Sequence, residues 1–374
     1  MTHTYDIAVI GAGIAGASIA AELAPHASVV VLEGEAQPGY HTTGRSAAFW
    51  EECYGGPGIV PLTLASRALL DQLGALSQRR ALYIARTGQE GELDAFMAQF
   101  AGTGVTIDKL AGHAALQAIV PGIKPDWAFA VSEPACADID VAAVHQHYLA
   151  TMRREGAELR VNARVEALER DLGEGGDGWR IDLGKAGEVR AAIVVNAAGA
   201  WADQIAQLAG ATPLGIQPYR RTVAQLRVDP PPPADLPLVL DLGGEFYFKP
   251  ESGRLWLSPH DETPSPPCDA APEELDVAIA IDRFEHVVDW KIAAVERKWA
   301  GLRSFAPDRL PVIGHATDRP GFFWFAGQGG YGIQTAPAAA RLGAQVLLGS
   351  RSDAVTARID AVAYGPARFA AQTG

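Results

Sequence analysis

The chain opens with apolar runs whose spacing predicts a strand, a helix and a second strand. Residues 5–10 are a short apolar run, residues 17–24 continue as an alanine-rich helix that ends at Pro25, and residues 28–33 are a second strand. We expect the remainder of the chain to be organised around this unit.

The turn between the first strand and the helix, at residues 11–16, reads G-A-G-I-A-G and so matches G-x-G-x-x-G. Gly11 permits a sharp turn, Gly13 lets backbone N–H groups approach a pyrophosphate, and Gly16 lets the helix pack closely on the strand. The N-terminus of the helix adds a partial positive charge. Glu33, about 20 residues further on, would accept hydrogen bonds from a ribose 2′-hydroxyl and repel a 2′-phosphate. The stretch predicts a dinucleotide site and argues against NADP.

Three later segments have the composition of ligand-contacting loops. Residues 36–48 place small hydroxyl residues around one arginine, which suits a second phosphate. A buried-type strand at residues 191–195 runs into small residues at 196–201, which would let a ligand reach the backbone. The glycine loop at residues 326–334 opens a helix from about residue 335 to residue 348, so its N–H groups and the helix dipole would face negative charge.

From Gln217 the pattern changes to short alternating strands and hairpins, which predict an antiparallel sheet that covers a pocket as a second, interleaved domain. The period of two places Tyr247 on the face opposite its two neighbours. Of Arg220 and Arg221, one guanidinium must face the covered side of the sheet, and the two compete for that position. Residues 173–178 predict a glycine-rich hairpin tip.

Composition narrows the class of protein. The 374 residues suffice for two domains, and 31 Lys and Arg against 44 Asp and Glu give a net charge of −13, which argues against nucleic acid as a partner. The three cysteines show no metal-ligand or disulfide spacing, so reduced thiols in the cytoplasm are expected. His145, His147, His260 and His286 are expected at the surface or in packing, and no metal site is predicted. No signal peptide and no transmembrane segment are expected, whereas peripheral attachment to a membrane stays open.

Taken together, these segments resemble the D-amino-acid oxidase family of FAD-dependent oxidoreductases and, within it, the bacterial D-arginine dehydrogenases. The likeness rests on G-A-G-I-A-G, Y-H-T-T-G-R-S-A-A, V-N-A-A-G-A-W, G-L-R-S-F and G-Q-G-G-Y-G-I-Q-T. It implies an α/β fold with a Rossmann-type FAD-binding domain and an interleaved α+β substrate domain on a mixed, largely antiparallel sheet. The FAD-binding domain is expected at residues 1–78, 140–215 and 300–374, and the substrate domain at 79–139 and 216–299.

The resemblance also implies roles for individual residues. FAD contacts are expected at Gly11, Gly13, Ala15, Gly16, Glu33, Thr42, Thr43, Arg45, Ser46, Ala47, Ala48, Val165, Ala198, Gly199, Gly329, Gly330, Tyr331, Gly332, Ile333 and Gln334. Four side chains are expected to hold the substrate carboxylate: Arg303, Tyr54, Tyr247 and Arg220. A carboxylate that leaves water favours a guanidinium with two parallel donors and additional O–H donors.

The substrate side chain is expected to meet Phe49, Glu51, Ala81 and Gln334. Two of these depart from the D-arginine dehydrogenase pattern. Phe49 stands at the position of an active-site histidine, and Ala81 stands at the position of the acid that would meet a cationic side chain. Glu51 would supply a replacement charge. The expected preference is therefore not strictly for arginine.

The activity implied is oxidative deamination of a D-amino acid to a 2-oxo acid and ammonia, by hydride transfer from Cα to flavin N5. One alternative is an oxidase of secondary amines or N-methyl amino acids, as in the sarcosine and glycine oxidases. Another is the flavin subunit of a hetero-oligomeric dehydrogenase. In an NAD-binding protein, the arginine-containing loop at residues 36–48 and the glycine loop at residues 326–334 would have no ligand to contact. The electron acceptor stays open between a quinone, a carrier and oxygen.

Overall fold

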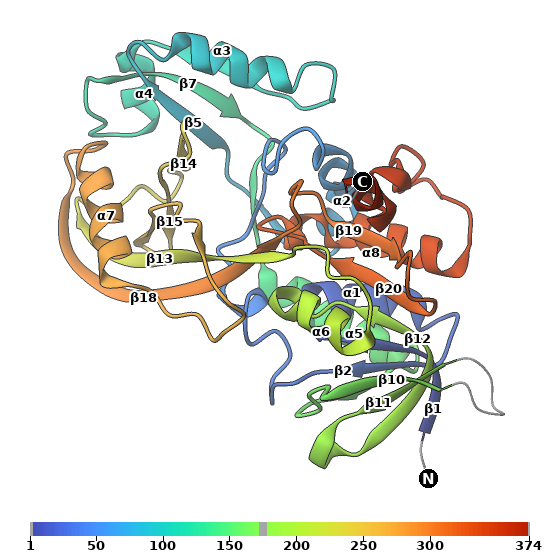
Figure 1. Ribbon diagram of the computed structural model, residues 1–374. Helices are drawn as coiled ribbons and strands as arrows, with labels where there is room; N and C mark the ends of the chain where they lie inside the picture. The colour runs from blue at the N-terminus through green and yellow to red at the C-terminus, as the bar shows by residue number, and fades with distance from the viewer. Residues whose placement is uncertain (1–2, 172–177, 373–374) are drawn as a thin grey trace.

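The computed structural model describes residues 3–171 and 178–372 of the chain. The hairpin tip expected at residues 173–178 lies outside the described residues apart from Gly178. Figure 1 shows two sheets with their helices, which meet in the middle of the molecule. None of the helices in the described ranges has the length and apolar content that crossing a bilayer requires.

The first sheet has eight strands in the order β10-β11-β12-β1-β2-β9, with β20 paired to β12 and β19 paired to β20. Its strands are β1 (His3–Ile10), β2 (Val29–Leu32), β9 (Glu158–Arg160), β10 (Ala167–Asp171), β11 (Gly178–Asp182), β12 (Glu188–Asn196), β19 (Val312–His315) and β20 (Phe322–Ala326). β1 is parallel to both β2 and β12. With helix α1 (Ile14–Leu23) between β1 and β2, the predicted strand, helix and second strand are confirmed.

Both faces of this sheet are covered, which explains why its central strands are continuous apolar runs. On one face Ile7 and Val9 join the core formed by α1, α5 (Val141–Arg154) and α8 (Gly332–Leu348). On the other face Ala8 and Ile10 join a second core with α6 (Ala202–Ala209) and the β10–β11 hairpin. Helix α2 (Val60–Gln72) packs against α8. The strand period of two therefore divides β1 between two cores.

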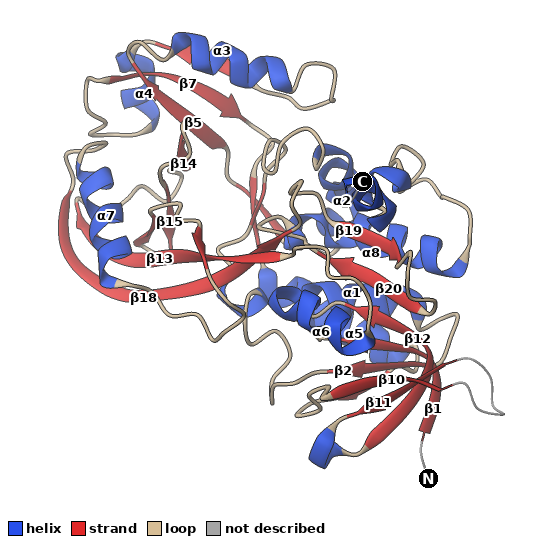
Figure 2. Ribbon diagram, viewed as in Figure 1, coloured by secondary structure: helices blue, strands red, loops and turns tan. Residues whose placement is uncertain are grey.

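The second sheet has nine strands in the order β17-β13-β16-β15-β14-β5-β7-β6, with β18 paired to β13. Its strands are β5 (Ala81–Arg86), β6 (Asp108–Ala111), β7 (Trp127–Glu133), β13 (Gln217–Asp229), β14 (Leu238–Asp241), β15 (Tyr247–Glu251), β16 (Arg254–Ser258), β17 (Thr263–Pro264) and β18 (Lys291–Phe305). Among the described residues the β14–β5 pairing is the one parallel pairing in this sheet, so the sheet is mixed and largely antiparallel, as expected. Helices α3 (Glu90–Gln99), α4 (His113–Ile119) and α7 (Glu274–Glu285) accompany it (Figure 2).

A small third sheet joins β3 (Phe49–Trp50), β8 (Ala137–Ile139) and β4 (Leu76–Gln78). The strands of the two large sheets come from the segments expected for the two domains, with one exception. β18 continues past residue 300 to Phe305, because it pairs with β13 along nearly its whole length. Arg303 therefore lies on the second sheet, where β13 and β18 reach toward the first (Figure 1). The domain boundaries otherwise stay predictions.

Candidate active site

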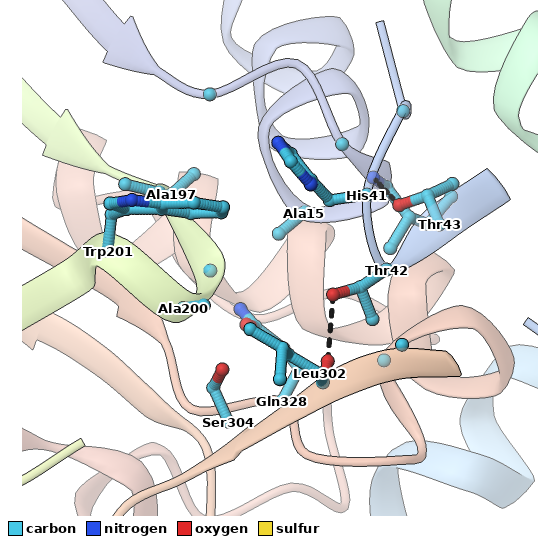
Figure 3. Close-up of a pocket in the computed structure, with 18 of the residues that line it drawn as sticks. Ala15, His41, Thr42, Thr43, Ala197, Ala200, Trp201, Leu302, Ser304 and Gln328 are labelled. Carbon is cyan, nitrogen blue, oxygen red and sulfur yellow. Dashed lines mark hydrogen bonds between the residues drawn. The ribbon is translucent and has the colours of Figure 1, made fainter. Parts of the chain in front are cut away.

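A cavity lies where the carboxyl ends of β1, β2 and β12 meet the β13–β18 pair, and Figure 3 shows part of its lining. One part of the lining contains Glu33 and Val165, and another contains the glycine turn after β1. The lining also includes Tyr247 and Arg303 from the second sheet. The carboxyl ends of parallel strands are the usual place for a ligand in such a sheet.

The turn after β1 requires glycine at two positions. Gly11 has φ +98°, and a Cβ there would lie 2.6 Å from the carbonyl oxygen of Ala197. A Cβ on Gly16 would lie 1.8 Å from the carbonyl oxygen of Gly11. Gly11 thus lets the β1 turn approach the segment after β12, and Gly16 lets α1 pack on the turn. Both contacts shape the wall of the cavity where the first turn of α1 presents its N–H groups.

Glu33 is held at the end of β2 by backbone donors. The N–H of Ala12 donates to its Oε2 at 2.8 Å, and the N–H of Glu35 donates to its Oε1 at 2.9 Å. The carboxylate lines the cavity and can accept further hydrogen bonds there. This arrangement suits a ribose hydroxyl, and that contact stays a prediction.

The loop after β2 closes over the glycine turn. Thr43 Oγ1 accepts from the N–H of Ile14 at 3.0 Å, and Thr42 Oγ1 donates to the carbonyl of Leu302 on β18 at 2.7 Å, as the dashed line in Figure 3 shows. The rings of His41 and Trp201 pack with their centroids 4.7 Å apart (Figure 3). The loop therefore fastens the first sheet to the second sheet along the cavity.

Arg45 lines the cavity, but its guanidinium is engaged by protein groups. It forms an ion pair with Asp269, and its Nη1 donates to the carbonyl of Ala270 at 2.7 Å. A phosphate would have to share this guanidinium with the 269–270 segment.

Most of the expected FAD contacts line the cavity, and four do not: Gly16, Ala48, Tyr331 and Gln334. Gly16 serves helix packing, and Ala48 packs on the core around α1. The hydroxyl of Tyr331 donates to the carbonyl of Arg309. Gln334 is 1% exposed and bonds both the N–H and the carbonyl of Glu51, so it does not reach the substrate side-chain position either. Gln334 lies inside α8, which begins at Gly332, earlier than the expected start.

The late glycine loop brings the backbone against the substrate end. A Cβ on Gly330 would lie 1.9 Å from the hydroxyl oxygen of Tyr54 and 3.0 Å from Cζ of Arg303. Tyr54 is not part of the cavity lining, but its hydroxyl lies against Gly330, which is. Three groups thus converge at one point: the Gly330 backbone, a phenol and a guanidinium.

Three aromatic rings pack together beside Arg303, and of these Tyr247 lines the cavity whereas Phe49 and Tyr54 do not. The guanidinium of Arg303 lies 5.7 Å from the ring centroid of Tyr54. The ring of Phe49 packs at 6.0 Å from that of Tyr54 and 5.9 Å from that of Tyr247, which is 2% exposed. Arg303 forms no ion pair with an acidic side chain in the ranges that the structure describes. It is thus a cation at the cavity without a fixed counter-charge.

The expectation for Arg220 is wrong, and Arg221 stands in its place. In the register of β13 and β18, Tyr219 lies opposite Arg303 and Arg221 lies opposite Gly301, so Arg221 shares a face with Arg303. Arg220 points to the other face, where it pairs with Glu273 and donates to Asp276 at 2.8 Å. Sequence alone shows that the two arginines alternate, but not which of them faces the cavity.

Glu51 does not supply the expected negative charge. It is fully buried, and both of its carboxyl oxygens lack a hydrogen-bond partner among the described residues. Burial, reinforced by the neighbouring charge of Glu133, raises the pKa of Glu51 well above its ordinary value, so the neutral acid is favoured. Glu133 lies opposite the buried Ala81, the other residue expected at the side chain. Neither Glu51 nor Ala81 lines the cavity.

Replacement of Glu51 by Gln should reduce the loss of stability at high pH. Below about pH 4.5 the carboxyl is protonated in both states; as the pH rises it ionises when unfolded but stays protonated when buried, so its contribution to stability falls. Gln cannot ionise. We expect Tm of Glu51→Gln to match the wild type near pH 4.5 and to exceed it at pH 8, by about 1–2 °C for each kcal/mol removed in a chain of 374 residues. Thermal unfolding across this pH range measures the difference.

Glu274→Gln is the matched control for this series, because Glu274 is exposed on α7. It should leave the pH dependence of Tm nearly unchanged. A Tm difference for Glu51→Gln that is the same at pH 4.5 and pH 8 would contradict a buried neutral acid.

His260 is a neighbour of the site that sequence patterns assign only to packing or the surface. Its ring lies 5.9 Å from that of Tyr247, and its Nδ1 bonds the carbonyl of Gly244 at 2.6 Å, which makes Nδ1 the protonated nitrogen. Burial, with the charges of Arg221 and Arg303, lowers the pKa of His260 to about 3. It is therefore neutral and adds no charge to this end of the cavity.

Comparisons with known proteins agree with this geometry. The family described as "FAD dependent oxidoreductase" (DAO) matches residues 6–346. The glycine oxidase of Geobacillus kaustophilus is 28% identical over 357 residues, which cover 90% of this chain and 91% of that enzyme. These relatives support the family of the resemblance, and within it they favour glycine oxidase rather than D-arginine dehydrogenase.

Solved structures share the fold. The crystal structure of glycine oxidase from Geobacillus kaustophilus has a TM-score of 0.81 at 24% identity and covers 97% of this chain and 98% of its own. L-α-glycerophosphate oxidase from Mycoplasma pneumoniae, with FAD bound, has a TM-score of 0.83 at 16% identity and covers 93% and 95%. At these identities the likeness concerns the fold alone.

Proposed function

The chain belongs to the DAO family of FAD-dependent oxidoreductases, and we propose that it oxidises the C–N bond of a small amino acid with a primary or N-methyl amine. Support comes from the glycine oxidase that is similar over 90% of the chain. The single observation that carries the substrate class is Arg303, a cation at the cavity beside two phenols and without an acidic partner in the described residues.

FAD is the cofactor of this family, and the cavity residues fit it. The glycine turn and the first turns of α1 and α8 present N–H groups suited to phosphates and to a flavin edge. Glu33 suits a ribose, and the hydroxyl of Ser304 is buried at the cavity without a partner among the described residues. When bound, FAD supplies the hydride acceptor for the carbon next to the substrate nitrogen.

Residues of the second sheet hold the substrate in this proposal. Arg303 binds the carboxylate with two parallel N–H donors, and the hydroxyls of Tyr54 and Tyr247 add two further donors. This fixes the Cα–H bond relative to the cavity, and such positioning is the main contribution that the protein makes to a cofactor-driven oxidation. Phe49 packs against the ring of Tyr247, at the position where the D-arginine dehydrogenase pattern has a histidine, so the amine would enter unprotonated rather than lose its proton to this residue.

D-amino acids with apolar side chains are the second candidate substrates, because Tyr247 presents an aromatic ring at the cavity and Phe49 packs against that ring. A cationic side chain is not favoured, since Glu51 is a buried neutral acid outside the cavity.

Anaerobic reduction of the bound flavin by single amino acids tests the proposal. We expect the purified chain to be yellow and its flavin to be bleached by glycine and sarcosine. D-alanine tests the second candidate, D-amino acids with apolar side chains, and D-arginine is the negative control. Bleaching by D-arginine alone would contradict the proposed substrate class, and a flavin that no amino acid reduces would contradict the activity of the isolated chain. Peroxide formed on admission of air would identify oxygen as an acceptor.

A further inference from the structure

Arg221 is a second guanidinium at the substrate end of the cavity. It is 4% exposed and lines the cavity, and its Nη1 is buried without a hydrogen-bond partner among the described residues. Its other nitrogens are engaged: Nε donates to the carbonyl of Asp261 at 2.7 Å, and Nη2 donates to Glu262 at 3.3 Å. An unsatisfied buried N–H of a charged group is costly, so Nη1 marks a position that a ligand acceptor would fill.

The register of the sheet places Arg221 diagonally across from Arg303 and not directly opposite it. Because Arg221 is opposite Gly301 and Arg303 is opposite Tyr219, the two arginines are diagonal neighbours on one face, with Cα atoms roughly 7–8 Å apart in such a pair. Gly301 has no side chain to fill the space opposite Arg221. Burial and the charge of Arg303 lower the pKa of Arg221 to about 10, so Arg221 stays charged at neutral pH.

One carboxylate does not need both guanidiniums. An ionised carboxylate has about four acceptor sites. Two N–H donors of Arg303 and the hydroxyls of Tyr54 and Tyr247 already supply four donors. Nη1 of Arg221 then has no acceptor left on the same carboxylate, and its charge would remain without an anion in the cavity.

We propose that the substrate is an amino dicarboxylate: its 2-amino acid carboxylate binds Arg303, and a second carboxylate on the side chain or on the nitrogen substituent binds Nη1 of Arg221. This inference rests on the proposed function, which it narrows from small amino acids to those with a second acidic group. Glycine and sarcosine are then minimal substrates that leave Nη1 of Arg221 without an acceptor. D-aspartate represents the side-chain arm, and N-carboxymethylglycine represents the nitrogen arm.

Binding of non-oxidisable acids to the FAD-loaded protein tests this without turnover. Succinate and propanoate differ by one carboxylate, and each can be titrated through the change in flavin absorbance and by calorimetry. We expect succinate to bind the wild type at least about tenfold more tightly than propanoate, because it gains a charge-assisted pair with Arg221. In Arg221→Gln this advantage should disappear, while propanoate binding changes by less than about threefold.

Reduction of the flavin by substrates gives the same comparison for catalysis. For the wild type, D-aspartate should have a higher kcat/KM than D-alanine, or N-carboxymethylglycine a higher kcat/KM than sarcosine. The first result would place the second carboxylate on the side chain, and the second result would place it on the nitrogen substituent. Arg221→Gln should remove the excess. If no amino acid reduces the flavin, the proposed function fails, and the succinate comparison still decides whether a second anion site exists.

Arg220→Gln is the matched control, since Arg220 is the adjacent arginine on the opposite face. It should preserve the preference for succinate. Arg221→Lys keeps the charge and guards against a folding defect in Arg221→Gln, and it should retain part of the preference. Equal binding of succinate and propanoate by the wild type, or an equal loss of both in Arg221→Gln, would overturn the inference and show that both arginines share one carboxylate.

Discussion

Replacement of Arg303 by Leu lowers kcat/KM for amino acid substrates by about 10³-fold and leaves FAD bound. Removal of one partner of a desolvated, hydrogen-bonded charge pair costs about 2–5 kcal/mol, which corresponds to roughly 30- to 5,000-fold. The value should fall in the upper part of this range because the phenols of Tyr54 and Tyr247 would be left to hold a buried carboxylate. Steady-state kinetics with glycine, together with the visible flavin spectrum, measures both parts of the prediction.

Arg303→Lys separates charge from geometry. Lys keeps a point charge but lacks the planar fork of donors, so an intermediate loss is expected. Arg220→Gln again serves as the control, because its guanidinium pairs with Glu273 and Asp276 on the far face of β13. An Arg303→Leu enzyme with unchanged kcat/KM would refute the carboxylate site on β18.

Replacement of Gly11 by Ala should yield a protein that retains little or no FAD. The residue has φ +98°, which costs an L-residue about 1–3 kcal/mol, and its Cβ would lie 2.6 Å from the carbonyl oxygen of Ala197, a backbone atom with little freedom to move. Either the glycine turn or the segment after β12 must shift, and both line the cavity. The ratio of flavin absorbance to protein absorbance after purification measures retention, and thermal unfolding of the apoprotein measures stability.

Gly156→Ala is the control for backbone strain. Gly156 has φ +95°, nearly that of Gly11, but a Cβ there would meet nothing within 4 Å, and the residue is not part of the cavity lining. It should lose a similar amount of stability from strain and keep its FAD. Full flavin content in Gly11→Ala would mean that the turn after β1 does not contact the cofactor.

Features of the fold that depend on local sequence could be predicted, and so could the identity of several cavity residues. The strand before Gly11, the helix after it and the strand before Glu33 follow from local periodicity and glycine chemistry. The largely antiparallel second sheet likewise follows from the alternation that begins at Gln217.

Residues whose behaviour depends on distant parts of the chain were predicted less well. The choice between Arg220 and Arg221 depends on how β13 pairs with β18, a contact between segments about 80 residues apart in sequence. The charge of Glu51 depends on burial against Glu133 from β7, which no local pattern reveals. Gln334 was expected at the ligand, but its amide bonds the backbone of Glu51 instead, because α8 begins at Gly332.

The pairing of β13 with β18 also gives the adjacent arginines Arg220 and Arg221 different constraints on their substitution. The irregularities in this ladder lie beyond Gln225, so the parity of positions 217 to 224 is fixed by the regular stretch that contains both arginines. A relative with a single arginine at position 221 would keep a cation at the cavity, whereas one with an arginine only at position 220 would turn that cation toward Asp276 on α7. A slip of one residue in the pairing of β13 with β18 would exchange the two arginines and, with them, the faces of the other side chains in this stretch.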